Sequence, residues 1–295
     1  MSMRNHGWPV CPRRYAGAFA EAAAIFASFI APIPPLKAAE NGAIIADFAG
    51  YWARPEPARG AANFYPLESG PKPVTFGPAA GEPRQGMPYI GDDANPILLP
   101  HAAEAIRAQR DMYARGEAVW SAWALCWPTG VPLNFGMVNA LQFLQAENEV
   151  TMIYQRGQTV RHIYLNEKHP PSPAHTWFGH SVGHYEGENS LVIDTIAQDP
   201  RALVDRFGTP KSDAIRVVER YTISADRRRL DVLIDVEDPK TFTTSWSATI
   251  AYTLLPPKSA ESPQDEVFAE IVCPENNRDA GGGGYPIPMA THFDF

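Results

Sequence analysis

The 295-residue chain is poor in cysteine, in positive charge and in long apolar runs, and each shortage excludes a class of protein. Its three cysteines include no CxxC pair, so neither a cysteine-based zinc site nor a haem-attachment motif is present. The net charge of −8 leaves no broad basic surface, on which non-specific nucleic-acid binding depends. Beyond the N-terminal segment, no run approaches the roughly 20 apolar residues that a membrane-spanning helix needs.

What the chain does have is typical of a folded protein made of short segments. Hydrophobic residues make up 45% of it and aromatic residues 11%, enough for a packed core. Its 29 prolines and 22 glycines divide it into short pieces joined by long loops. Short pieces favour strands over helices.

The N-terminal segment has the features of an export signal. Three arginines precede an Ala-, Phe- and Ile-rich stretch over 16–31, and the small residues Ala38 and Ala39 follow. We therefore expect residues 1–39 to be a signal peptide or leader and the protein to be periplasmic or secreted. A disordered cytoplasmic leader is the alternative.

Two cysteines, Cys126 and Cys273, lie beyond this segment. In an oxidising compartment they could form one disulfide between the middle and the end of the chain. Two separate buried thiols fit the sequence equally well.

Alternation of apolar and polar residues predicts strands along most of the chain after residue 140. Between Leu230 and Val236 every even-numbered residue is apolar, and from Phe242 to Leu254 the even positions are mostly apolar whereas the odd positions 243–249 carry only Thr and Ser. The predicted strands are 43–52, 141–146, 149–155, the regions around 160–164 and 191–195, 214–223, 230–236, 242–254 and 267–273.

About eight or nine strands joined largely by hairpins predict a mainly β fold, an antiparallel up-and-down barrel around a small cavity. A two-sheet sandwich fits nearly as well. Helical spacing over about 100–116 predicts one helix, which would act as a lid or plug, and the Pro- and Gly-rich stretch 53–100 predicts a long covering loop. We expect one domain over 40–279 and a flexible tail over 280–295.

Histidines cluster in the middle of the chain, where five of the eight lie within 23 positions. Imidazoles can transfer protons near neutral pH or bind a metal. A metal site would need His180 and His184 on one helical face, with Glu186 or His175 completing it, but glycines interrupt such a helix. We interpret this segment as an extended loop, in which that spacing has no meaning. We therefore predict no metal. The five are His162, His169, His175, His180 and His184.

The same region contains a G-x-S-x-G pattern over 179–183. A nucleophile elbow requires a strand before the serine and a helix after it. Neither flank fits, because a Pro-rich segment precedes the pattern and a turn entering a strand follows it. The pattern does not predict a serine hydrolase.

Glu219 is the carboxylate with the most unusual position, because strand parity places it on an apolar face with Val217 and Tyr221. Such a group either has a raised pKa suited to proton transfer or forms a structural ion pair, here with Arg161 or Arg220. Both interpretations remain open. His162 and Tyr164 likewise share one strand face.

Aromatic residues could line a cavity for a flat ligand, although residues of this kind more often fill a core. The set is Trp123, Trp127, Tyr164, Trp177, Tyr185, Tyr221, Trp246 and Tyr252.

Several of these segments together resemble a family of bacterial exported proteins, most without an assigned activity. The resemblance spans about Asp47–Asp279 and is carried by GHSVGHYEGENSLVIDT over 179–195, RVVERY over 216–221 and VCPENNRD over 272–279. The family's usual central motif is GHS(V/I)GxWEGDxLVVDT, so Tyr185 stands in place of Trp, and Glu188 and Asn189 depart from it too. The resemblance implies export and a calycin-like barrel, and suggests action on small aromatic compounds such as lignin-derived fragments.

These observations predict a cofactor-independent acid/base enzyme of the lyase, dehydratase or isomerase type, acting on a small aromatic or apolar molecule in the barrel. The chain has no P-loop and no Rossmann glycine pattern, so no cofactor is expected. His180 or His184 would move the proton, while Tyr164 and Glu219 would orient or polarise the substrate. The predicted substrate-binding residues are His162, His175, Trp177, Tyr185, Trp246 and Arg161.

The alternative is a non-catalytic, lipocalin-like carrier of a small apolar ligand in the periplasm. A Gly-x-Trp sequence, Gly50 to Trp52, at the end of the first predicted strand agrees with it. A structural module of an envelope assembly is disfavoured because the chain has no internal repeat.

Overall fold

Alternating burial marks the strands that build the fold. The structure is a computed structural model, and it describes residues 46–54, 64–76, 90–115, 126–136, 140–155, 157 and 159–255. The elements are β1 (Gly50–Ala53), β2 (Tyr65–Pro66), α1 (Pro100–Ala114), the 3₁₀ helix η2 (Leu133–Gly136), β3 (Leu141–Gln145), β4 (Glu149–Tyr154), β5 (Thr159–Leu165), β6 (His180–Glu186), β7 (Ser190–Ile196), β8 (Arg216–Ile223), β9 (Arg229–Glu237) and β10 (Trp246–Leu254).

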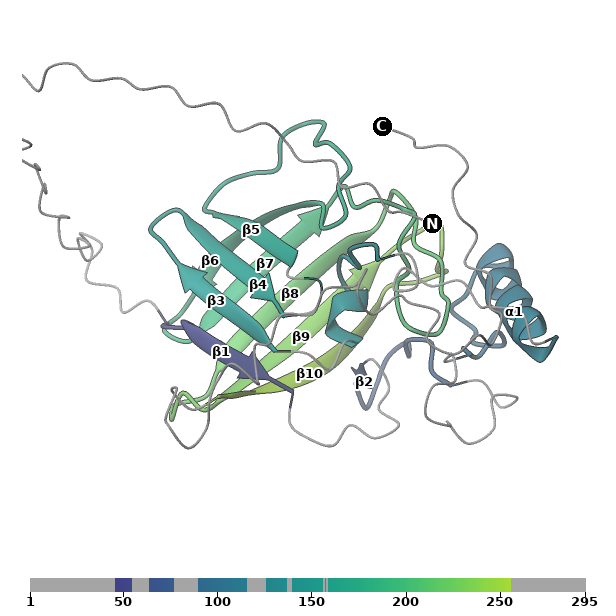
Figure 1. The fold of residues 1–295 in the computed structure, drawn as a ribbon, viewed down its shortest axis with the longest axis horizontal. Coiled ribbons are helices and arrows are strands. Elements are labelled where there is room, and N and C mark those ends of the chain that lie inside the picture. The colour runs from purple at the N-terminus through teal and green to yellow at the C-terminus, as the bar shows by residue number, and fades with distance from the viewer. Residues whose placement is uncertain are drawn as a thin grey trace, which may run out of the picture. The chain divides into compact units, whose positions relative to one another are not determined.

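Nine of these strands close into a barrel, which confirms the predicted mainly β, calycin-like fold (Figure 1). The order is β1-β3-β4-β5-β6-β7-β8-β9-β10, and β10 pairs back onto β1. Neighbours are antiparallel except β5 and β6, which run parallel. A ring with an odd number of strands cannot alternate direction all the way round, so one parallel pair is required. The long connection over 166–179 makes that pair possible.

The parity predicted for the later strands is confirmed. In β9 the even-numbered residues are buried and in β8 the odd-numbered ones are, so Glu219 and Tyr221 face inward. In β10 the even-numbered residues from Trp246 to Tyr252 are buried. These inward side chains join those of β3, β4 and β5 in one hydrophobic core.

The two ends of the barrel differ in their connections. At one end, called here the turn end, short turns join β3 to β4, β6 to β7 and β8 to β9. At the other, the loop end, lie the segments 126–136, 197–215 and 238–245, and the connection 166–179 arrives at the start of β6. The loop end is on the right in Figure 1, the side on which α1 is drawn.

The predicted helix over about 100–116 is confirmed as α1. It is anchored beside the loop end, because the Leu99 N–H donates to the Thr241 carbonyl and the Thr243 N–H donates to the Ile97 carbonyl. Ala102 and Ile106 turn into the core and are fully buried. All four residues of η2 are buried as well.

Two local predictions were wrong. The glycine-flanked segment 180–186, predicted as a loop, is strand β6; its flanking glycines, Gly179 and Gly187, have φ of +68° and +58° and lie outside the strand as turns. The predicted covering loop 53–100 contains the short strand β2, which pairs with β10. The predicted leader, the strand 267–273 and the tail 280–295 lie outside the described residues.

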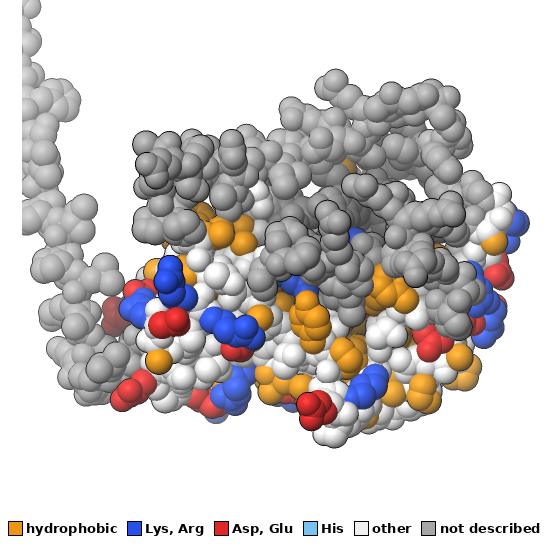
Figure 2. Space-filling model, turned by 90° about the horizontal axis from the view of Figure 1, so that it is seen from below, with side chains coloured by type: hydrophobic (Ala, Val, Ile, Leu, Met, Phe, Trp, Pro, Cys, Tyr) orange, Lys and Arg blue, Asp and Glu red, His pale blue; other side chains and the backbone are white. Residues whose placement is uncertain are grey.

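The described residues all belong to one compact unit, Asn41–Phe295. Within them, no helix has both the length and the apolar character needed to cross a membrane. Figure 2 shows positive and negative side chains interspersed over the turn end, at the left of the view, instead of a surface of one sign.

Candidate functional site

The residues predicted to form one site lie in three separate places. Because β5 and β6 alternate in and out of the barrel, His162, Tyr164, His180 and His184 project from its outer surface. Glu219 lies inside, so the barrel wall separates it from all four. The predicted catalytic set therefore does not converge on one point.

Inside the barrel, Glu219 forms a buried ion pair with Arg161. Their exposed fractions are 0% and 2%, and the Arg161 Nη1 and Nη2 atoms donate to the carboxylate at 2.9 and 2.6 Å. Tyr221 Oη donates to the same carboxylate at 2.8 Å. Arg161 also donates to Ser181 Oγ at 3.1 Å and to Thr195 Oγ1 at 2.5 Å.

This network matches the structural interpretation of Glu219. Burial opposes a charge on Arg161, but the adjacent Glu219 carboxylate outweighs it, and the pKa of the guanidinium is raised. Both charges are held by specific partners, as buried charges must be. Ser181 of the G-x-S-x-G pattern is part of this network in mid-strand, which explains why the pattern is not a nucleophile elbow.

The other predicted inward residues are spread along the barrel. Tyr185 lies near the turn end, where its Oη accepts a hydrogen bond from Gln145 Nε2 at 2.8 Å and its ring stacks on Phe48. Trp246 is packed between Phe64 and Phe242, and its Nε1 is buried without a hydrogen-bond partner among the described residues.

On the outer surface the histidines form local pairs. His169 Nδ1 and His180 Nδ1 are 3.0 Å apart, so only one of the two atoms carries the shared proton. Burial, and then the neighbouring His169, lower the pKa of His180. His162 contacts Glu149, and His184 contacts Glu186, which also pairs with Arg220.

The loop end gathers a different set of groups, centred on Lys211. This lysine is only 4% exposed, and its Nζ donates to Gln198 Oε1 at 3.2 Å. Burial lowers its pKa to about 7, with Asp199 and Asp238 opposing the shift. A lysine with a pKa near 7 is partly neutral at physiological pH and can act as a base.

The side-chain amide of Gln198, beside Lys211, has a donor without a hydrogen-bond partner among the described residues. Its Oε1 accepts from both Lys211 Nζ and the Val131 N–H, at 3.2 and 3.0 Å, which fixes the orientation of the amide. Its Nε2 is therefore buried without a partner in the described part of the chain. Buried donors are rarely left so, and an acceptor atom of a ligand or an ordered water would satisfy this one.

Aromatic, arginine and histidine side chains of the same loop segments form further contacts at this end. The Trp127 and Trp177 rings lie 5.1 Å apart, and the Arg201 guanidinium covers both at 5.4 and 4.7 Å. His175 Nδ1 lies 3.1 Å from the backbone carbonyl oxygen of Gln198. Because that oxygen can only accept, Nδ1 carries the proton, and in the neutral ring Nε2 carries none. We call these six residues, Trp127, His175, Trp177, Gln198, Arg201 and Lys211, the loop-end cluster.

Gly130 shows how closely the cluster is packed. Its φ is +65°, and a Cβ there would lie 2.3 Å from the Trp177 carbonyl oxygen and 2.9 Å from Lys211 Nζ. The Trp177 backbone and the Lys211 amine therefore meet at a position that only glycine can occupy.

Sequence reasoning identified His175 and Trp177 but missed Lys211, Gln198 and Arg201. These three lie in 197–215, a segment with no strand or helix and hence no periodicity to show which side chains turn inward. The sequence offered no local signal for Lys211, which follows Pro210 in a segment of mixed polar and apolar residues.

No protein-family model matches the chain, and no curated protein matches it. The described residues also hold no group of three His, Cys, Asp or Glu side chains that could bind a metal ion. The loop-end cluster is therefore the feature from which a function can be inferred.

Proposed function

We propose that the protein is an enzyme that uses acid/base chemistry, without an organic cofactor, on a small aromatic carbonyl or phenolic compound at the loop end. The reaction is an elimination or an isomerisation. The observation that supports this most is the side-by-side position of two buried groups. One is the Lys211 amine, whose pKa is lowered to about 7, and the other is the Gln198 amide, whose Nε2 has no partner among the described residues. The resemblance noted in the sequence suggests lignin-derived aromatics as the source of substrates.

Five members of the cluster have roles that their positions support. The neutral amine of Lys211 removes a proton from the carbon next to a carbonyl, and Gln198 Nε2 donates to the oxygen on which negative charge then develops. The Trp127 and Trp177 rings stack on the aromatic part of the substrate. In an elimination, a protonated His175 returns a proton to the leaving hydroxyl, which departs as water.

This assignment replaces part of the set expected from the sequence. His180, His184 and Tyr164 lie on the outer surface and have no role in this reaction, and Glu219 forms the structural ion pair of the barrel wall. His175 and Trp177 keep the roles in substrate binding that the sequence suggested, and His175 gains one in proton transfer.

Location outside the cytoplasm is part of the proposal. Cys126, next to Trp127, is in a disulfide, and the other cysteines of the chain, Cys11 and Cys273, lie outside the described residues. Stable disulfides are typical of oxidising compartments, which supports a periplasmic or secreted protein.

A carrier without catalysis is the second candidate, and the half-buried Trp127–Trp177 pair favours it, because stacking alone can hold a flat ligand. Under this candidate Gln198 Nε2 donates a hydrogen bond to the ligand, and Lys211 only sets the charge of the binding site.

Proton exchange separates the two candidates. We would incubate 3-hydroxy-1-phenylpropan-1-one with the full chain in D₂O and follow its C2 protons and the loss of water by ¹H NMR. The enzyme should accelerate C2 exchange with a midpoint near pH 7, and Lys211→Met should lose about 10²- to 10⁴-fold of that acceleration. Lys240→Met is the matched control, since Lys240 is an exposed lysine of the same end, paired with Asp213.

The outcomes are distinct. Exchange that survives Lys211→Met contradicts the proposed base. Quenching of tryptophan fluorescence by the same compound, with no exchange in any variant, supports the carrier instead.

A further inference from the structure

The barrel has a gap at its closing seam. β1 pairs with β10 as far as Ala53 and Thr253, whereas β2 covers β10 at Thr249 and Ala248. Between these stretches neither β1 nor β2 pairs with Ile250 or Ala251. The seam is thus joined on both sides of a short piece of β10 that pairs with β9 but has no partner on its seam edge.

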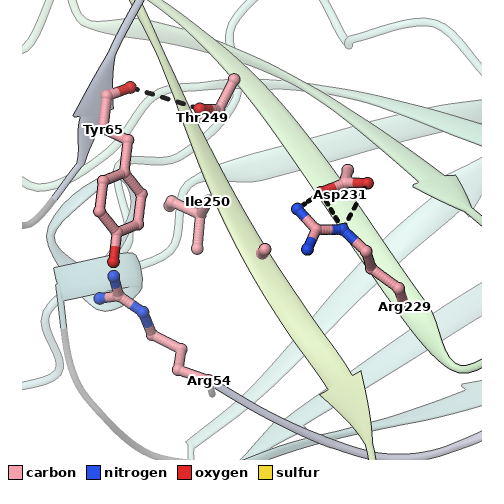
Figure 3. Close-up of a pocket in the computed structure, with 7 residues that line it drawn as sticks. Arg54, Tyr65, Arg229, Asp231, Thr249 and Ile250 are labelled. Atoms are coloured by element: carbon pink, nitrogen blue, oxygen red, sulfur yellow. Dashed lines mark hydrogen bonds and ion pairs between the residues drawn. The ribbon is translucent and has the colours of Figure 1, made fainter. Parts of the chain in front are cut away.

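A pocket of about 330 Å³ lies at this gap. This volume is at the small end of the range of ligand sites, roughly 300–1,000 Å³. Figure 3 shows Arg54 and Tyr65 on one side of β10 with Ile250, and Arg229 with Asp231 on the other. The lining residues are Arg54, Tyr65, Arg229, Asp231, Thr249, Ile250 and Ala251.

Arg54 is the group that requires explanation. It is only 6% exposed, its Nη1 donates to the Phe135 carbonyl at 3.0 Å, and its Nη2 is buried with no hydrogen-bond partner in the described ranges. No described carboxylate lies within ion-pair distance of it. A guanidinium is always charged, and a buried charge without a counter-ion is costly.

Its neighbours offer little compensation. The Tyr65 ring centroid is 5.9 Å from Arg54 Cζ, near the outer limit of a cation–π contact. Arg229 and Asp231 are already bound to each other, at distances down to 2.7 Å. Two arginines and one aspartate leave the described lining with one uncompensated positive charge, carried by Arg54.

We propose that this pocket binds a small organic carboxylate. The Arg54 Nη2 donates to the carboxylate, the Tyr65 phenol, toward which the guanidinium points in Figure 3, supplies a second donor, and the apolar part of the ligand lies against Ile250 and Ala251. A single free charge suits a monoanion. The proposal concerns a site distinct from the loop-end cluster and does not depend on the reaction proposed there.

Calorimetry with benzoate tests the proposal, with benzyl alcohol as a neutral compound of similar size. Wild-type protein should bind benzoate and not benzyl alcohol. Arg54→Met should weaken benzoate binding by about ten- to a hundredfold, because a charge-assisted hydrogen bond is lost. Lys240→Met, which alters an exposed lysine outside this pocket that is paired with Asp213, should change the affinity by less than about threefold. Lys211→Met should bind benzoate as the wild type does.

Folding is checked separately from binding. Arg54→Lys keeps a positive charge but loses the planar, two-pronged donor geometry of the guanidinium. This variant should therefore remain folded and bind benzoate, but with a lower affinity than the wild type. In thermal melts, benzoate should raise the melting temperature of the wild type and of Lys240→Met and leave that of Arg54→Met unchanged.

Four results would overturn the proposal: benzoate affinity that is unchanged in both Arg54 variants; benzyl alcohol binding as tightly as benzoate; phosphate displacing benzoate at equal concentration, which would make this an inorganic-anion site; and benzoate binding that appears only after Glu56→Gln. Glu56, two residues beyond Arg54, lies outside the described residues, and the last result would assign the counter-charge to the chain itself.

Discussion

The two ends of the barrel treat their charged groups differently. At the turn end they are exposed and paired: Arg227 contacts Asp47, and Ser224 and the Arg228 N–H hydrogen-bond Asp226 and lower its pKa. At the loop end Asp205, Lys211 and Asp238 are buried instead. Burial raises the pKa of Asp205 to about 6 and lowers that of Lys211 to about 7.

This difference separates stability from chemistry. Exposed, paired charges contribute little to stability but are easily tolerated. Buried groups whose pKa values move toward neutrality cost stability, and such groups are frequent at functional sites. The barrel wall between the two ends supplies the stability that offsets this cost.

The wall itself should be the most sensitive region. Arg161→Met leaves the Glu219 carboxylate buried and unpaired, and should lower the free energy of unfolding by about 3–5 kcal/mol. Urea denaturation followed by tryptophan fluorescence measures this. Arg216→Gln on β8 is the control, because its pairing with Asp194 is half exposed and should contribute less than about 1 kcal/mol. A loss of less than 1 kcal/mol in Arg161→Met would show that the wall does not supply this stability.

One substitution made at both ends compares them directly. Gly130→Ala and Gly187→Ala both force alanine into positive φ, but the first Cβ meets the Trp177 backbone at 2.3 Å and the second has nothing within 4 Å. The first should cost about 2–5 kcal/mol and the second about 1–2 kcal/mol, read from chemical denaturation. Equal costs would mean that the loop end is no more tightly packed than the turn end.

The cost of burying charge at the loop end should depend on pH. The Asp205 carboxyl has a pKa of about 6 in the folded protein against 3.8 in the unfolded chain, so the folded state binds more protons between these values. Stability from this group is therefore complete below pH 4 and is lost as pH rises through 6. Asp205→Asn keeps an acceptor for the Phe207 and Thr209 N–H groups, and should stabilise the protein by about 1–3 kcal/mol at pH 7.

Melting temperatures at pH 4 and pH 7 check this expectation. The gain from Asp205→Asn should largely disappear at pH 4, where the carboxyl is protonated in the folded protein and close to half protonated in the unfolded chain. A gain of the same size at both pH values would contradict burial of a charged Asp205.

The smallest effect is expected at the turn end. Arg227→Gln removes an exposed ion pair with Asp47 and should change the free energy of unfolding by no more than about 0.5 kcal/mol. Guanidinium denaturation at low and high salt would measure it. A loss above 1 kcal/mol would show that the turn end also depends on its charges.

The sequence predicted most of the barrel because inward and outward residues alternate. Parity placed Glu219 and Trp246 inside, and burial confirms both. The same parity was available for His180 and Ser181, but the glycines at 179 and 183 suggested a loop. In the structure Gly183 lies within β6, where a Cβ would meet Ile163 at 2.8 Å, so close packing explains it.

The site was less predictable, for a physical reason. Histidines that are close in the sequence can all turn to one site when they lie on a loop. In strand β6, however, every second residue points away from the interior, so His180 and His184 lie outside the barrel. Lys211 and Gln198 are 13 positions apart and meet through loop packing that no periodicity encodes.

The protonation state of Lys211 can be read directly. A ¹³C-lysine sample of the full chain, with Lys211→Met to assign the signal, gives the Cε and Hε shifts of Lys211 between pH 5 and 11. A base poised at the loop end predicts a midpoint near pH 7, about three units below the exposed lysines. A midpoint near 10.5 would mean that the amine stays charged, and the loop-end cluster would then have no base.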